Sequence, residues 1–231
     1  MTGRRAVAHV DTMTRADRAQ KVLASLRREY PEARPLLLYR SPFELLIAVI
    51  LSAQTTDEQV NRATPQLFLR FPGPAELGSA PIEELESIVH GVGFFRTKAR
   101  NIRATAAMVA DEFGGTVPDS IDKLVRLPGV GRKSANVVVS HCYSLPGIIV
   151  DTHFSRVSRR IGLVRQTAPE KIEQEIASYV PKDSWTALSM CVNYHGRRCC
   201  TARKPACFRC VVSELCEYGS KTPAPESESS R

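Results

Sequence analysis

The sequence has no long apolar run. Its longest uninterrupted apolar stretch is Leu45–Leu51, whereas a membrane-spanning helix needs about 20 such residues. The first 20 residues contain four arginines and no apolar stretch of the length that a signal peptide requires. We therefore expect a protein that crosses no membrane and is not secreted.

Strand-like alternation of apolar and polar residues is also nearly absent, which argues against a sheet. Helical periodicity dominates instead and predicts an all-α fold. The clearest helix start is Ser41-Pro42-Phe43-Glu44, with Ser41 as N-cap. The helix after it is apolar on all sides, so we expect it to be buried. Other helices are expected near 14–29, 82–90, 96–112, 120–126 and 132–142, after Asp151, after a capping box at Thr167–Glu170, and around Trp185.

Acidic residues are outnumbered, with 24 Asp and Glu against 32 Lys and Arg, a net charge of +8. A basic surplus on a compact chain is typical of proteins that bind a polyanion, and nucleic acid is the first candidate. A basic protein without such a partner would have the same composition. With 231 residues, 43% of them hydrophobic, the chain can form one large domain or two lobes.

A tight turn precedes a lysine in the stretch LPGVGRK, residues 127–133. Because glycine tolerates positive φ, the turn between helices 120–126 and 132–142 predicts a helix-hairpin-helix. The second helix begins with unpaired backbone amides, which attract a phosphate. We expect contacts with the DNA backbone from Gly129, Val130, Gly131 and Arg132. The alternative is an ordinary helix-to-helix turn with a glycine C-cap.

Lys133 projects from the first turn of the helix expected at 132–142. A neutral lysine amine is a nucleophile that forms Schiff bases, and C1′ of a deoxyribose is the matching electrophile in DNA. Asp151, in Val150-Asp151-Thr152-His153, is expected to cap the next helix. It could also stabilise positive charge on the sugar. The alternative for Lys133 is a plain contact with a phosphate.

Seven cysteines in a chain without a signal peptide favour a metal site or free thiols over disulfides. Four of them follow the pattern C-x6-C-x2-C-x5-C, namely Cys200, Cys207, Cys210 and Cys216. A single C-x2-C pair, with longer spacers to the outer two cysteines, favours a [4Fe–4S] cluster over zinc. Cys199 is an alternative first ligand, and Cys142 and Cys191 are expected to be buried thiols.

The loop between the first two predicted ligands carries Arg203 and Lys204. Metal ligands on either side would hold this loop in place, and its two cations could then bind a phosphate. The alternative is a basic loop that contacts only solvent.

Together, LPGVGRKSANVV, VDTH and the cysteine pattern resemble the endonuclease III family, bifunctional DNA glycosylases of base-excision repair in the helix-hairpin-helix superfamily. LLIAVILSAQTTDEQVN at 45–61 and GFFRTKARNI at 93–102 also match, so the resemblance covers about residues 15–218. It implies two helical lobes with a DNA-binding cleft between them. One continuous lobe, residues 37–146, would carry the hairpin. The other, 14–36 plus 147–219, would carry the [4Fe–4S] loop, with a flexible arm at 1–13 and a disordered tail at 220–231.

The resemblance also implies roles for single residues. Lys133 matches the family's Schiff-base lysine, Asp151 its essential aspartate, and Gln54 the glutamine that fills the gap left by an extruded base. Phe94 lies near the family's intercalating position, where an aliphatic residue is expected. The implied substrate is double-stranded DNA with oxidised pyrimidines or abasic sites, nicked by β-elimination. We expect a monomer in the cytoplasm, associated with the nucleoid.

Two alternatives remain at this point. The adenine-specific mismatch glycosylase resembles the chain in fold and cluster, but it normally lacks the hairpin lysine and has an additional C-terminal domain. A non-catalytic protein could also use the hairpin only to hold the DNA backbone. Lys133 argues against the first alternative, and trapping with borohydride would separate an enzyme from the second.

Overall fold

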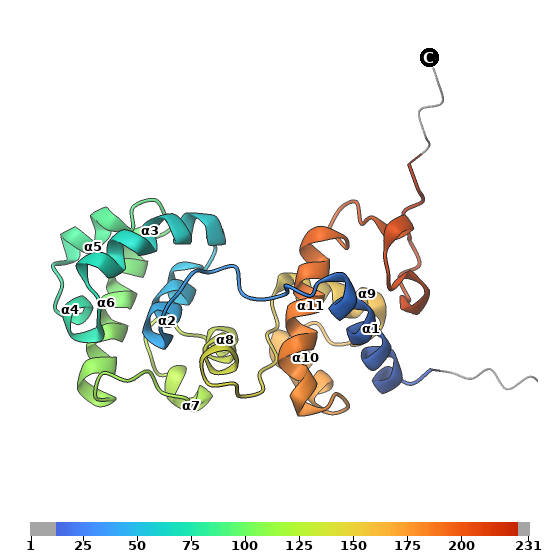
Figure 1. Ribbon diagram of the computed structural model, residues 1–231, viewed down its shortest axis with the longest axis horizontal. Coiled ribbons are helices and arrows are strands. Elements are labelled where there is room, and N and C mark those ends of the chain that lie inside the picture. Colours follow the sequence, from blue (N-terminus) through green and yellow to red (C-terminus); the bar gives the residue numbers. More distant parts are fainter. Residues whose placement is uncertain (1–12, 226–231) are drawn as a thin grey trace, which may run out of the picture.

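The computed structural model describes residues 13–225, and every regular element in that range is a helix (Figure 1). The α-helices are α1 (Arg15–Glu29), α2 (Pro42–Leu51), α3 (Asp57–Arg70), α4 (Pro74–Gly78), α5 (Ile82–Ile88), α6 (Phe95–Glu112), α7 (Ile121–Leu124), α8 (Arg132–Cys142), α9 (Thr152–Ile161), α10 (Pro169–Ala177) and α11 (Trp185–Arg198). Short 3₁₀ turns are η1 (Lys182–Ser184), η2 (Cys207–Arg209) and η3 (Ser213–Leu215). The predicted all-α class is confirmed. The predicted arm, apart from Met13, and residues 226–231 of the predicted tail lie outside the described residues.

Two separate hydrophobic cores divide the described helices into two lobes, which stand side by side in Figure 1. In the first lobe, residues 43 and 45–51 of α2 are all buried, as the apolar sequence of this helix predicts. Ser41 caps α2 by accepting a hydrogen bond from the Glu44 amide at 3.2 Å. Helices α3 to α8 surround α2 and complete this core.

The second lobe combines the start of the chain with its end. Its core contains α1 residues together with residues from α9, α10 and α11, and Phe154 and Leu26 are among its fully buried side chains. Helices α9 and α11 approach closely at Gly196, where a Cβ would lie 2.9 Å from the His153 Cβ. Glycine at this position therefore sets the distance between the helix that follows Asp151 and the helix that leads into the cysteine-rich segment.

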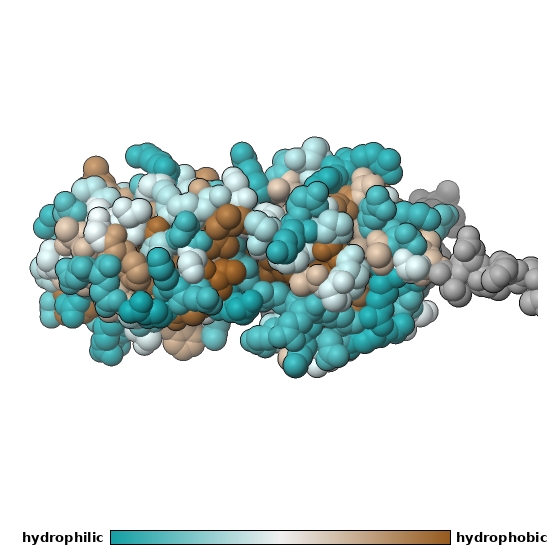
Figure 2. Space-filling view, turned by 90° about the horizontal axis from the view of Figure 1, so that it is seen from below, coloured by the Kyte–Doolittle hydropathy of each residue, from teal (hydrophilic) through white to brown (hydrophobic). Residues whose placement is uncertain are grey.

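The chain crosses between the lobes twice, once before α2 and once after α8. In the first crossing, Asn61 of α3 donates to the Leu36 carbonyl and accepts from the Leu38 amide, both at 2.9 Å. The return segment contains the extended stretch 148–150, whose Ile149 amide donates to the Ser189 hydroxyl at 3.0 Å. Figure 2 shows hydrophilic residues over most of one face, with apolar residues gathered near the middle of the molecule.

Two features of the fold differ from the sequence-based expectations. Helices α3 and α4 occupy a region for which no helix was predicted, although α3 begins with a complete Thr56–Gln59 capping box and continues through Pro65. The capping box predicted at Thr167–Glu170 is wrong. Because Pro169 occupies the first helical position, the N-cap of α10 is Ala168, whose methyl side chain cannot accept a cap hydrogen bond.

The described helices also bear on the membrane prediction. Over residues 13–225, no helix combines the length and the apolar character that a bilayer crossing demands.

Candidate active site and cysteine-rich loop

The predicted hairpin consists of α7, a turn and α8, as the sequence indicated. Gly129 has φ +79°, and a Cβ there would lie 2.8 Å from the side-chain nitrogen of Asn101, so the turn requires glycine. Gly131 has no such requirement, because nothing lies within 4 Å of an added Cβ. It is the N-cap of α8 and provides no side-chain cap. The first-turn amides of α8 are therefore open to an external acceptor.

The other predicted backbone-contacting residues of the hairpin are already engaged within the protein. Val130 is buried, and its amide donates to the Leu127 carbonyl at 3.1 Å. Arg132 forms a two-pronged ion pair with Glu173 of α10, with both nitrogen–oxygen distances at 2.8 Å. This carboxylate raises the pKa of Arg132. The ion pair joins the hairpin lobe to the second lobe.

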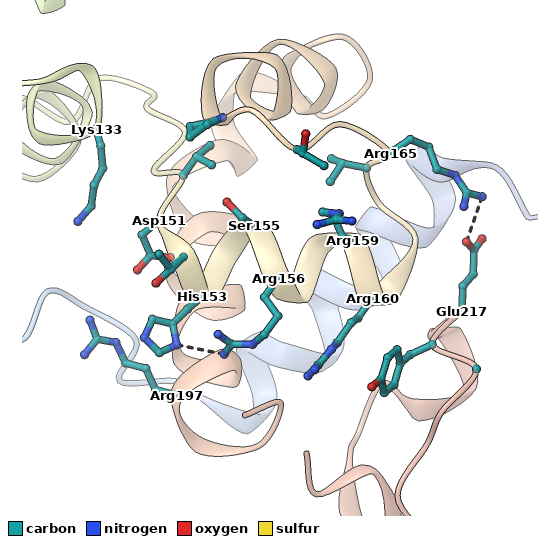
Figure 3. Close-up of a pocket in the computed structure, with 17 residues that line it drawn as sticks. Lys133, Asp151, His153, Ser155, Arg156, Arg159, Arg160, Arg165, Arg197 and Glu217 are labelled. Atoms are coloured by element: carbon teal, nitrogen blue, oxygen red, sulfur yellow. Dashed lines mark hydrogen bonds and ion pairs between the residues drawn. The ribbon is translucent and has the colours of Figure 1, made fainter. Parts of the chain in front are cut away.

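Asp151 is the N-cap of α9, as predicted, with Oδ1 accepting from the Phe154 amide at 2.7 Å. Its other oxygen, Oδ2, accepts from the side-chain amide of Asn193 on α11. The stretch 148–150 leads to Asp151, which lies on the side of the second lobe that faces α8 (Figure 3). The carboxylate is thus held at both oxygens by groups of its own lobe.

Lys133 and Asp151 line the same open pocket of about 1110 Å³ between the lobes. Figure 3 shows the Lys133 side chain extending from α8 beside Asp151, with its amine exposed. The remaining wall comes mainly from α9. Six basic side chains line the pocket against two carboxylates, Asp151 and Glu217; the basic residues are Lys133, Arg156, Arg159, Arg160, Arg165 and Arg197. An amine, a fixed carboxylate and an excess of positive charge suit a polyanion that reacts at one atom.

Gln54 and Phe94 both have positive φ, 54° and 58°, and both are exposed. Phe94 exposes 69% of its surface, unusual for an aromatic residue. The two turns lie next to each other, because a Cβ on Gly93 would be 3.6 Å from the Gln54 carbonyl oxygen. Left-handed backbone at non-glycine residues is costly and is often found at functional sites.

A buried lysine connects these two turns, and sequence reasoning did not identify it. Lys98 of α6 is 4% exposed, and its Nζ donates to the Thr55 hydroxyl at 2.5 Å. Burial lowers the pKa of Lys98. The interaction spans 43 positions of the chain, so no local pattern indicated it.

The four predicted cluster ligands meet in one enclosed, mostly apolar site at the end of the second lobe. No disulfide joins any of the described cysteines. Cys200, Cys207, Cys210 and Cys216 line this site together with Cys199. Thiols gathered in an apolar enclosure are the donor set that an iron–sulfur cluster requires, so the residues fit that group. Cys191 is buried as predicted, whereas Cys142 is only partly buried. Burial raises the pKa of Cys142 to about 11 and also raises that of Cys191.

Buried His195 lies against this site. It places Nε2 3.4 Å from the Cys210 sulfur, while Nδ1 lies 3.1 Å from the Tyr30 hydroxyl. The potential ligand atoms of His195, Cys199 and Cys210 all lie within 4.8 Å of one another. His195 thus lies at the edge of the thiol site, with its ring hydrogen-bonded on the far side to Tyr30.

The loop with Arg203 and Lys204 is exposed at its tip and held at its base. Arg160 of α9 donates to the Thr201 and Ala202 carbonyls at 2.7 and 2.8 Å, and its guanidinium lies 4.6 Å from the Tyr218 ring centroid. The two cations therefore extend from a fixed base toward solvent. Sequence reasoning identified the loop but not the arginine that holds it.

Comparison with known proteins gives a consistent identity. Residues 47–182 match the profile of the HhH-GPD superfamily of base excision DNA repair proteins, and residues 200–216 match the iron–sulfur binding domain of endonuclease III. The fold and the site thus define a helix-hairpin-helix DNA glycosylase with an iron–sulfur domain.

Individual relatives narrow this class. Endonuclease III of Synechocystis sp. is 44% identical over 204 residues, covering 88% of this chain and 93% of the relative. That of Escherichia coli (strain K12) is 38% identical over 209 residues, covering 90% and 99%. A solved structure of a trapped endonuclease III–DNA covalent intermediate superposes with a TM-score of 0.83 at 41% identity, covering 87% of this chain and 95% of that one. The chain belongs to the endonuclease III family. It is a bifunctional DNA glycosylase and abasic-site lyase, and its cofactor is a [4Fe–4S] cluster.

Proposed function

We propose that Lys133 and Asp151 carry out the reaction, and that the substrate is duplex DNA with an oxidised pyrimidine or an abasic site. The observation that carries the proposal is their meeting in one basic pocket, each supplied by a different lobe. A family relative that forms a covalent intermediate with DNA supports it. A damaged nucleotide would rotate out of the duplex into this pocket, and unstacking costs least for a damaged base.

The proposed chemistry has two stages. Lys133 Nζ bonds to C1′ as the bond from C1′ to the base breaks, and the base leaves with the electron pair and takes up a proton. Opening of the sugar ring then gives an imine between Lys133 and C1′. The imine acidifies the C2′ protons, and loss of one of them expels the 3′ phosphate by β-elimination. Asp151 stabilises the positive charge that develops on the sugar and orients the amine.

DNA binding is proposed to use several separate surfaces. The open amides at the start of α8 would donate hydrogen bonds to a phosphate, with Gly131 as the point of closest approach. Gln54 and Phe94 would enter the base stack together, because their turns adjoin. Arg203 and Lys204 would bind a second phosphate from the cluster loop. Arg132 would need to share its charge between Glu173 and the DNA.

Cys200, Cys207, Cys210 and Cys216 are the proposed cluster ligands, since the matched segment of the iron–sulfur domain begins and ends with the first and last of them. When bound, the cluster would cross-link the C-terminal loop and take no part in bond breaking. Cys199 would remain a neighbouring thiol. The purified protein is expected to be yellow-brown, with absorbance at about 400 nm. A colourless, zinc-loaded preparation would contradict this assignment.

We propose that the lobe boundaries fall at 36/37 and 146/147, in the two crossings, and that the protein works in the cytoplasm on the nucleoid. The separate cores support the first statement, and the basic charge with a DNA substrate supports the second. Fractionation of cells that express the protein would test the location. Recovery with DNA that nuclease treatment abolishes is the expected result, and recovery with the membrane fraction would contradict it.

The catalytic assignment can be tested by trapping with borohydride. Wild-type protein mixed with a duplex that carries thymine glycol should become covalently attached to the DNA. Lys133→Gln should give no attached product and no strand scission. Lys21→Gln, which removes the same charge at an exposed position of α1, is the matched control and should behave like the wild type. Scission by Lys133→Gln at the wild-type rate would overturn the proposal.

A further inference from the structure

Asn193 is hydrogen-bonded to the proposed catalytic aspartate. It lies near the middle of α11 in the second lobe and donates its side-chain N–H to Asp151 Oδ2. Asn193, Asp151 and Lys133 together line a second, smaller pocket of about 80 Å³, next to the 1110 Å³ pocket. Since Oδ1 is already occupied by the Phe154 amide, the bond from Asn193 fixes the remaining rotation of the carboxylate.

The orientation of the Asn193 amide is set by its other partner. Arg197, one turn further along α11, donates Nε–H to Asn193 Oδ1 at 2.9 Å. A guanidinium can only donate and a carboxylate can only accept. The amide oxygen must therefore face Arg197 and the amide nitrogen must face Asp151. Of the two possible orientations of the Asn193 amide, only this one forms both hydrogen bonds.

Arg197 is itself tied to the other lobe. Its guanidinium lies 3.4 Å from Asp57 Oδ2, at the first residue of α3. Asp57 follows the turn that contains Gln54. A chain of contacts therefore runs from this turn through Arg197 and Asn193 to Asp151. Figure 3 shows Arg197 on the same side of the pocket as Lys133 and Asp151.

We propose that Asn193 is a positioning residue for the glycosylase step, holding Asp151 in the rotamer that faces the Lys133 amine. The inference rests on the proposed function, because it assigns Asn193 a role only through Asp151. It predicts a contribution to the rate of base release and none to DNA affinity. Asn193 does not line the 1110 Å³ pocket, and its side chain bonds only to Asp151 and Arg197 among the described residues.

The test is a double-mutant cycle on single-turnover release of thymine glycol from a duplex. Asn193→Leu removes both hydrogen bonds at similar volume and should slow release about tenfold, as expected when a catalytic group loses its alignment. Affinity for a duplex with a non-cleavable abasic-site analogue should stay within about twofold of wild type. In an Asp151→Asn background the same change should have no additional effect, because the group it positions is gone.

Two further variants separate positioning from general damage. Asn193→Ala, which adds no bulk, should reproduce the slow release. Asn61→Leu is the matched control, since it removes two hydrogen bonds from an asparagine outside the pocket and should lower the melting temperature but not the rate.

Three results would count against the inference. Base release at the wild-type rate by both Asn193 variants would overturn it. So would a loss of rate in the Asp151→Asn background as large as the loss in the wild-type background. Release by Lys133→Gln at the wild-type rate, measured in the same series, would instead overturn the proposed function and this inference with it.

Discussion

Asp151 uses its two carboxylate oxygens for different partners, one for the start of α9 and one for Asn193. Asp151→Asn keeps an acceptor for the cap, because asparagine also caps helices well. Its new N–H groups would face the donor of Asn193, so we expect a loss of about 1 kcal/mol in the free energy of unfolding. Base release should fall by about a hundredfold or more, because the negative charge is lost. Thermal melts and single-turnover assays check both values, and full activity in a folded variant would leave Asp151 with the cap alone.

His141 is expected to make the stability of the protein depend on pH. Burial lowers its pKa, and its Nε2 has no hydrogen-bond partner among the described residues. The unfolded chain therefore binds a proton more readily than the folded one below about pH 6.5. Stability should fall as pH drops from about 7 to 5.5.

His141→Leu removes the titrating group and should lose less stability than the wild type over the same range of pH. Urea melts at several pH values measure the difference. Parallel loss of stability in both proteins would contradict a role for His141.

Single residues were predictable where a local motif carried the signal. Lys133 and Asp151 were named from LPGVGRK and VDTH, and the Asp151 cap is confirmed. The contacts of Lys98 and Asn193 were not predicted, because each residue bonds to a partner more than 40 positions away. Neither the hydrophobic periodicity nor the spacing of motifs indicates a contact between residues so far apart in the sequence.

At the scale of elements, the two glycines of the hairpin turn are expected to serve different purposes, Gly129 folding and Gly131 DNA binding. Gly129→Ala should lose about 1–2 kcal/mol of stability, because φ is positive and Asn101 blocks the Cβ. Gly131→Ala should fold normally, since nothing lies near its Cβ, yet it should weaken DNA binding by obstructing a phosphate. Melts combined with fluorescence anisotropy on duplex DNA test the pair. Undiminished binding by Gly131→Ala would mean that no phosphate approaches there.

The cluster loop depends on Arg160 of α9. Lysine at this position keeps the charge but cannot donate to two carbonyls from one planar group. Arg160→Lys should lose its absorbance at about 400 nm faster than the wild type in the presence of an iron chelator. Arg159→Lys, an exposed neighbour on the same helix, is the control. Equal rates for all three proteins would show that Arg160 does not hold the loop.

Helices were predictable when caps and periodicity agreed. α2, α6, α8 and α9 lie within a residue or two of the expected positions. α3 was missed although Thr56–Gln59 forms a capping box, because Pro65 interrupts the pattern and tertiary packing stabilises the helix regardless. The start of α10 was misassigned by one residue, since proline at the first position determined it rather than threonine.

At the scale of the whole molecule, two ion pairs join the lobes, Arg132–Glu173 and Arg197–Asp57. Glu173→Gln should change stability by no more than about 1 kcal/mol, because Arg132 is half exposed. The freed guanidinium should bind duplex DNA, so the logarithm of the binding constant should fall more steeply with salt, by about one unit of slope. Anisotropy titrations on undamaged duplex between about 50 and 200 mM salt measure it. An unchanged slope would contradict this account of Arg132.

The two-lobed arrangement was inferred from family resemblance, not from periodicity. Composition and helical pattern gave the all-α class, but they hold no information on which helices share a core. The pairing of α1 with α9 and α11 joins segments more than 100 residues apart. Only the order of several motifs, recognised together, indicated that the ends of the chain would form one lobe.

The central claim is that the Lys133 amine bonds to the sugar of a damaged nucleotide. It is tested most directly by reducing the reaction mixture with borohydride, digesting the linked protein and locating the attached nucleotide by mass spectrometry. The account predicts that the modification lies on Lys133 and on no other lysine. A linked nucleotide on Lys98, Lys204 or the N-terminal amine, with Lys133 unmodified, would contradict it.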